Sequence, residues 1–140
     1  MTQSLRRALF VAVSLLLPGV VFSTELPGKW TLSVENADHV VLATLRVEFT
    51  EKPARSCMSG EWKVVKVVSA KTTDKHFFPA SDPLSYHIEN NQLTIGRNRV
   101  CDDYLWLQGP VDGASVNGDY FSLGLGGTSP LGHFNLIRTR

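Results

Sequence analysis

The stretch Gly28-Lys29-Trp30 (GKW) has a form, glycine followed two residues later by an aromatic residue, that recurs along the chain. The other copies are Gly60-Glu61-Trp62, Gly118-Asp119-Tyr120 and Gly132-His133-Phe134. Each copy opens an apolar run, and glycine permits a tight turn before an extended segment. We therefore interpret the four copies as the starts of strands in one sheet.

Short β-rich runs follow one another through the rest of the chain, separated by Gly, Pro, Asn and Asp, and no run has a helical period. The segment SYHIENNQLTIG (85–96) predicts a hairpin, with Asn90-Asn91 as its two-residue turn. The pattern predicts strands in eight places: near 30–34, 41–49, 61–68, 85–89, 92–96, 104–108, 114–125 and 133–138. Only the stretch 69–83 is irregular, and Phe77-Phe78-Pro79 within it is expected to cap one end of the sheet.

Eight short antiparallel strands without a covering helix leave unpaired edges unless the sheet closes on itself. The expected fold is therefore all-β, an eight-stranded antiparallel up-and-down barrel, with a β-sandwich as the alternative. A barrel of this size is either just filled by its own side chains or holds one small ligand.

The first 23 residues have the pattern of a secretory signal peptide. Arg6 and Arg7 form a basic start, ALFVAVSLLLPGVV supplies an apolar core, and Val21-Phe22-Ser23 fits a small-residue cleavage site. The alternative is a membrane anchor, but the apolar core is short and no stop-transfer signal flanks it. We expect cleavage after residue 23 and an exported mature chain, periplasmic or extracellular, with no membrane span.

The mature chain that this cleavage leaves, residues 24–140, is nearly neutral. It has 117 residues, with 12 Lys and Arg against 13 Asp and Glu, which makes one domain and a formal charge of −1. Binding to nucleic acid needs a concentrated basic face, so we exclude nucleic acid as a partner. Cys57 and Cys101 are the only two cysteines, and an even pair in an exported protein predicts a disulfide. Two free thiols are the alternative, although no C-x-x-C spacing supports redox activity.

Gly28 and Trp30 at the first of eight strands resemble the calycin group, which includes lipocalins, fatty-acid-binding proteins, avidins and some bacterial protease inhibitors. In that group the tryptophan closes one barrel end, and an Arg or Lys from the last strand lies across its indole. The resemblance implies that Trp30 and Arg138 form this closure, with a cation–π contact between guanidinium and indole.

The stretch ELPGKWTLS (25–33) is similar to the start of the secreted bacterial inhibitors of metalloproteases. Those inhibitors are exported and small, carry one disulfide, and inhibit through the segment ahead of the first strand. The resemblance implies an enzyme as partner and a role for Thr24 to Pro27, the residues ahead of the first strand.

No catalytic or metal-binding motif is visible. The chain has no Gly-x-Ser-x-Gly elbow, and neighbours such as Asp102 and Asp103 face opposite sides of a strand. The histidines occur singly, without the spacing of a metal site: His39, His76, His87 and His133. We expect no enzymatic activity, no metal and no cofactor.

Aromatic residues are the candidates for binding. Six of them are interpreted as an inward-facing lining: Trp62, Tyr86, Tyr104, Trp106, Tyr120 and Phe134. Such a lining suits a small apolar or amphipathic ligand in the barrel mouth, gated by the loop around Phe77-Phe78 and by the Gly124–Gly132 hairpin. Alternatively these aromatic residues simply fill the interior, or those at the rim anchor a protein partner. The expected function is non-catalytic binding of such a ligand. The alternative is a secreted or periplasmic protein inhibitor of an enzyme such as a protease, acting through its N-terminal segment or mouth loops.

Overall fold

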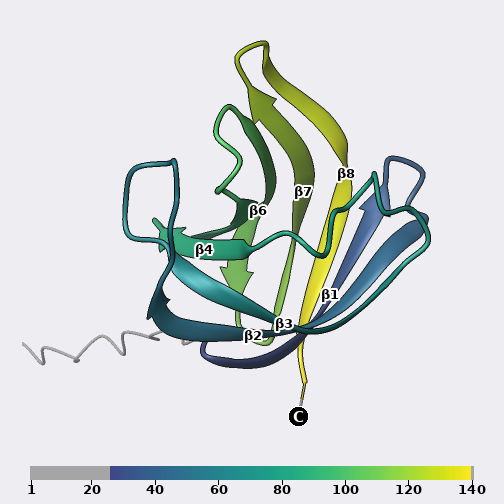
Figure 1. The fold of residues 1–140 in the computed structure, drawn as a ribbon. Helices are drawn as coiled ribbons and strands as arrows, with labels where there is room; N and C mark the ends of the chain where they lie inside the picture. Colours follow the sequence, from purple (N-terminus) through teal and green to yellow (C-terminus); the bar gives the residue numbers. More distant parts are fainter. Residues whose placement is uncertain (1–25, 140) are drawn as a thin grey trace, which may run out of the picture.

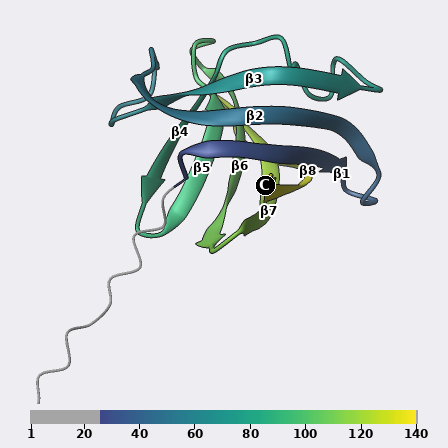
Figure 2. The same ribbon diagram turned by 90° about the horizontal axis from the view of Figure 1, so that it is seen from below.

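The computed structural model describes residues 26–139, and the predicted signal peptide, residues 1–23, lies outside this range. Eight strands close into one barrel in which each strand pairs antiparallel with its sequence neighbours and β8 returns to β1 (Figures 1 and 2). The strands are β1 (Gly28–Asn36), β2 (Val41–Pro53), β3 (Lys63–Thr72), β4 (Leu84–Glu89), β5 (Gln92–Arg97), β6 (Asp103–Asp112), β7 (Ser115–Gly124) and β8 (Gly127–Arg138). The predicted up-and-down barrel is confirmed, in preference to a sandwich. Among the described residues, no helix has the length and apolar character needed to cross a membrane.

The alternating strand directions give the barrel two ends. At one end lie four connections that we call the mouth loops: 37–40, 73–83, 98–102 and 125–126. At the other, which we call the closed end, lie Leu26, the turns after β4 and β6, and the end of β8. The longest connection at the closed end, residues 54–62, joins β2 to β3.

Alternating apolar residues form the core, because successive side chains of a strand face opposite sides of the sheet. Trp30, Leu32 and Val34 of β1 are buried, and so are alternate residues of β2 from Ala43 to Phe49. The turn between β4 and β5 has the predicted geometry: Asn90 and Asn91 have φ angles of 50° and 62°. Both angles suit a two-residue hairpin turn that follows the twist of the strands.

Two of the four Gly-x-aromatic copies do not start strands, which corrects the sequence interpretation. Gly28 does begin β1, and Gly60 lies just before β3, but Gly118 and Gly132 lie inside β7 and β8. A Cβ on Gly132 would lie 1.9 Å from the carbonyl oxygen of Glu35, and one on Gly118 would lie 2.0 Å from that of Gln108. These two glycines are therefore needed because neighbouring strands come unusually close where the sheet curves.

The loop 73–83 covers the mouth of the barrel. It connects β3 to β4, which pair over only three residues of each strand, Lys63–Val65 and Leu84–Tyr86. Phe78 of this loop is buried in the core, and the Tyr120 hydroxyl donates a hydrogen bond to the Phe77 carbonyl oxygen at 2.6 Å. The barrel is thus plugged from the mouth side by its own chain, at the place where Phe77-Phe78-Pro79 was expected to form a cap.

Candidate functional site

The barrel interior is filled by the protein's own side chains. Tyr86, Tyr120 and Phe134 lie in the buried core together with Trp30 and aliphatic residues from all the strands. A small gap beneath Phe78 has no space for a water molecule, its accessible volume being about 0 Å³. A ligand of ordinary size needs a pocket of about 300 to 1,000 Å³. This gap at the mouth is therefore too small for the ligand that the sequence predicted there.

The other three predicted lining residues face outward, so the prediction of one inward lining is wrong for Trp62, Tyr104 and Trp106. In β6 the inward residue is Leu107, which pairs with core residue Ile95, so its neighbour Trp106 faces out. Tyr104, two residues before Trp106, shares the outward face. Trp62 precedes Lys63, which pairs with inward Tyr86, so Trp62 lies on the outer face.

These outward aromatic residues form a second apolar layer against the barrel wall. The Trp62 ring stacks on His87 with centroids 4.3 Å apart, and the Trp62 and Trp106 centroids are 6.1 Å apart. Although they are outside the barrel, Trp62 is only 4% exposed and Tyr104 only 8% exposed. The layer packs the 54–62 loop onto the outside of β4, β5 and β6, so its first role is structural.

The predicted disulfide fastens the same loop. Cys57 and Cys101 are bonded, with their Cα atoms 5.5 Å apart, which joins the 54–62 loop to the mouth loop 98–102. The Cys57 backbone N–H also donates to the Asn98 carbonyl oxygen at 2.8 Å. The buried Asn98 side chain accepts from Trp106 Nε1 at 2.8 Å and donates to Ser85 Oγ at 3.0 Å. No sequence signal indicated this role of Asn98, because nothing in a polar turn distinguishes a buried amide from an exposed one.

The closed end is sealed by Trp30, Leu26 and Arg138. The Arg138 guanidinium carbon lies 4.6 Å from the centre of the Trp30 ring, and Arg138 Nη1 donates to the Pro27 carbonyl oxygen at 3.2 Å. The indole N–H of Trp30 donates to the Leu26 carbonyl oxygen at 2.9 Å, and the Leu26 side chain is 1% exposed. The segment ahead of β1 therefore crosses this end of the barrel as a plug.

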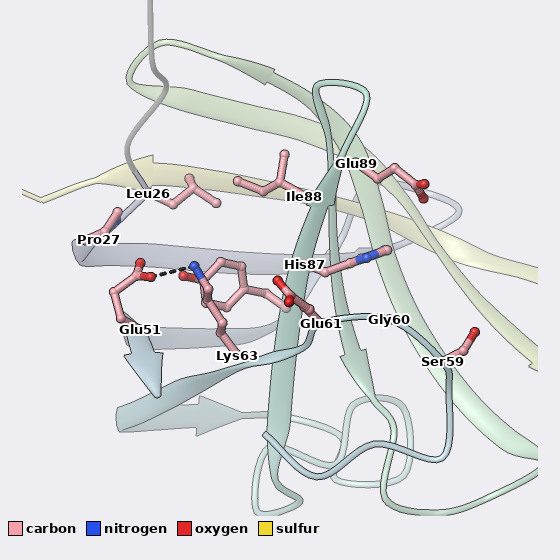
Figure 3. Close-up of a pocket in the computed structure, with 11 residues that line it drawn as sticks. Leu26, Pro27, Glu51, Ser59, Gly60, Glu61, Lys63, His87, Ile88 and Glu89 are labelled. Atoms are coloured by element: carbon pink, nitrogen blue, oxygen red, sulfur yellow. Dashed lines mark hydrogen bonds and ion pairs between the residues drawn. The ribbon is translucent and has the colours of Figure 1, made fainter. Parts of the chain in front are cut away.

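A surface cavity of about 790 Å³ lies beside this plug, between the end of β4 and the start of β3 (Figure 3). Apolar and charged groups both line it: Leu26, Pro27, Glu51, Ser59, Gly60, Glu61, Lys63, Tyr86, His87, Ile88 and Glu89. On its rim Lys63 Nζ pairs with Glu51 Oε2 at 2.5 Å. The cavity lies outside the barrel, and no sequence pattern indicated it because its walls come from four separate segments: 26–27, 51, 59–63 and 86–89.

Tyr86 separates this cavity from the core. Its hydroxyl donates to the Thr50 carbonyl oxygen at 2.9 Å, and burial, followed by the nearby Glu51 carboxylate, raises the pKa of Tyr86 from 10.0 to about 12. Burial likewise raises the pKa of Tyr120 above its ordinary value, while the Arg97 charge acts in the opposite direction. Both phenols therefore stay protonated across the physiological range.

Replacement of Tyr86 by phenylalanine tests this assignment through the pH dependence of stability. The folded pKa is raised, so the stabilising contribution of Tyr86 is complete below pH 10 and is lost as the pH rises from 10.0 to about 12. We expect the free energy of unfolding of the Tyr86→Phe variant, measured in urea, to fall less steeply over this window than that of the wild type. At pH 8 the variant is expected to lose about 1 kcal/mol with its hydrogen bond. Identical slopes above pH 10 would contradict the raised pKa.

Two histidines that are distant in sequence meet near the mouth. The rings of His39 and His133 stack with centroids 4.6 Å apart, and each Nδ1 faces a carboxylate, on Glu35 at 3.0 Å and on Asp119 at 3.3 Å. Within residues 26–139, no group of three or more His, Cys, Asp or Glu side chains is arranged to hold a metal ion. The pair fastens the mouth loop 37–40 to β8. Single histidines in different segments carried no sequence signal for this contact.

The mouth loops carry exposed aliphatic side chains. Val40, Val100 and Leu125 lie in three different mouth loops and are 52%, 42% and 92% exposed. Their surroundings are polar or glycine-rich, and the plugged mouth behind them gives the loops a fixed base. All three therefore lie in connections at the same end of the barrel.

Comparison of the chain with protein families, with characterised proteins and with solved structures gave no match. The fold and the site together define the class of protein: a closed eight-stranded barrel with one disulfide and a filled interior.

Proposed function

We propose that this protein is an exported, non-catalytic binding protein of calycin-like fold, whose partner is another protein docked on the mouth loops. The filled interior carries the proposal, because it leaves the outer surfaces as the places where binding occurs. The disulfide is compatible with an oxidising compartment such as the periplasm or the extracellular space.

Three of the four mouth loops present an exposed aliphatic side chain, and the barrel holds those loops on a rigid frame. Loops fixed by a scaffold bind proteins with little loss of conformational entropy. Residues 25–33 resemble the secreted bacterial inhibitors of metalloproteases, small exported proteins that bind an enzyme through the segment ahead of the first strand. Here we assign the contact to the mouth loops, because they carry the exposed aliphatic side chains. The proposed partner is accordingly an exported enzyme such as a protease, and the protein acts as its inhibitor.

The test is inhibition by the purified mature protein, titrated against exported proteases from the same source. We expect one of them to be inhibited at a stoichiometry of 1:1. The variant Val40→Asp/Val100→Asp is expected to weaken inhibition roughly 10-fold or more, because charged groups cannot enter an apolar contact. Val68→Asp is the matched control, since Val68 is 55% exposed on β3, away from the mouth loops.

Two results bear against the proposal in different ways. If extension of the chain ahead of Thr24 abolishes inhibition while the mouth variant inhibits normally, the N-terminal segment at the closed end is the inhibitory element. If native mass spectrometry of protein from its own compartment shows a bound small molecule and no protein partner, the proposal is wrong.

A small amphipathic ligand is the second candidate, favoured by the closed-end cavity. Its volume of about 790 Å³ falls in the range of small-molecule sites, and it combines apolar Leu26 and Ile88 with charged Glu51 and Lys63. Such a ligand would lie on the outside of the barrel and not within it. Replacement of Ile88, which is 42% exposed, by aspartate would then remove the co-purifying molecule without unfolding the protein.

A further inference from the structure

We infer that the β7–β8 hairpin is the main anchor of the protein, and that Leu125 at its tip enters an apolar pocket of the partner protein. The inference rests on the proposed function and names one residue and one kind of partner site within it. It is carried by the exposure of Leu125, the shape of the hairpin and the absence of charged residues between Asp119 and His133.

Leu125 is the most exposed large hydrophobic residue in the described part of the chain. It is 92% exposed, whereas the next, Val68, is 55% exposed. The hairpin that carries it projects beyond the other mouth loops, at the upper edge of Figure 1. A leucine so placed gains nothing for the fold, and it offers nearly its whole side chain to a partner.

The hairpin is shaped as a narrow knob. Strands β7 and β8 stay paired up to Gly124 and Gly127, so the tip consists of Leu125 and Gly126 alone. A Cβ added at Gly126 or Gly127 would meet nothing within 4 Å. Glycines on both sides leave Leu125 as the single side chain of the tip, and the paired strands hold it in place before binding. Such pre-organisation reduces the entropy lost on association.

The chemistry of the hairpin specifies the kind of site that it enters. No Asp, Glu, Lys, Arg or His occurs between Asp119 and His133, so the tip suits an apolar pocket without a charged wall. A bilayer surface fits poorly, because one leucine buries little apolar area and no basic residue between Asp119 and His133 attracts anionic lipid. The surface cavities described on the protein itself have ionisable side chains in their walls, which does not match an uncharged knob of a second copy. The cavity of about 790 Å³ has Glu51, Glu61, Lys63 and Glu89, and an otherwise apolar one of about 360 Å³ has Asp119 and His133. The occupied site is therefore an apolar pocket, of the size of one branched aliphatic side chain, on a different protein.

The experiment uses a photo-crosslinking amino acid, p-benzoylphenylalanine, at position 125 of the full chain expressed in its own host. Position 68 serves as the matched exposed control, and position 40 reports a second mouth loop. We expect one exported protein to be crosslinked from 125 and not from 68. The identified protein is then purified and its affinity measured for the unlabelled mature protein and for its variants.

In that measurement Leu125→Asp is expected to weaken binding at least 30-fold and Leu125→Ala about 10-fold, while Leu125→Met stays within about 3-fold. Val68→Asp is expected to bind like the wild type. All four variants should melt at nearly the wild-type temperature, because substitutions at exposed positions rarely affect the fold.

The outcomes separate the two proposals. The anchor role of Leu125 is wrong if Leu125→Asp leaves binding of the partner unchanged. It is also wrong if a partner is crosslinked from position 40 but never from position 125. Both results leave the proposed function standing. Absence of any protein crosslinked from either mouth position overturns both. Flotation of the protein with phosphatidylcholine or phosphatidylglycerol vesicles would assign Leu125 to a membrane. A dimer in solution that Leu125→Asp dissociates would assign it to a second copy. Either result would also contradict the anchor role of Leu125.

Discussion

Replacement of both Cys57 and Cys101 by serine is expected to lower the free energy of unfolding by about 4 kcal/mol. The disulfide closes a loop with a sequence separation of 44, and the restriction that such a loop places on the unfolded chain has this size in the chain-entropy treatment. The bond also holds the 54–62 loop against the barrel wall, where Trp62 packs on His87. The measurement is urea unfolding of the oxidised wild type and the double variant at neutral pH.

The variant also reports whether the outer aromatic layer depends on the bond. Asn98 bonds to the Cys57 N–H and to Trp106, so we expect the loop to stay attached in part and the barrel to remain folded. Reduced wild-type protein is the control, and it should unfold at the same urea concentration as the double variant. A loss below about 1 kcal/mol would mean that the hydrogen bonds and aromatic contacts alone already restrain the loop.

Replacement of Trp30 by alanine is expected to cost about 3 to 5 kcal/mol, the range for deletion of a large aromatic side chain from a core. Trp30 is 0% exposed, contacts the Phe49 ring edge-on at 6.0 Å, and lies beneath the Arg138 guanidinium. Its removal leaves a cavity at the closed end and also frees the Leu26 carbonyl from its hydrogen bond. The free energy of unfolding in urea measures the loss, with circular dichroism to establish that the variant folds.

Trp106→Ala is the matched control for the Trp30 prediction, because Trp106 lies in the outer layer and is only partly buried. We expect a smaller loss there. Arg138→Ala should cost less than either, about 0.5 to 1 kcal/mol, as expected for a cation–π contact at an exposed side chain. An equal loss at Trp30 and Trp106 would show that the closed end contributes no more to stability than the outer layer.

The barrel itself could be predicted because its signals are local. Alternating apolar residues in β1 and β2, and the pair Asn90-Asn91 that turns β4 into β5, each act over a few residues. The pairing of Cys57 with Cys101 followed from there being only two cysteines. Closure followed from a general argument, since a closed sheet leaves no unpaired edge, whereas the alternative β-sandwich does.

The side of the sheet on which each aromatic residue lies could not be predicted as reliably. Alternation says that Trp106 and Leu107 face opposite sides, but it does not say which of them is inside. The pairing of Leu107 with Ile95 decides it, and that register is a tertiary property. In the same way, Trp62 and Tyr104 are buried outside the barrel because the 54–62 loop folds back over the wall, a path that no local pattern describes.

By itself, the sequence determined an antiparallel barrel, its turns and its disulfide, because dihedral preferences and side-chain alternation act between near neighbours. Only the tertiary structure decided that the interior is filled, that Leu26 plugs the closed end, and that Leu125 is left exposed on a projecting tip. These features depend on how much volume the inward side chains occupy together and on where distant segments meet. The volume that the inward side chains fill and the contacts between distant segments depend on the whole chain, so they are fixed only once the strands have closed into a barrel.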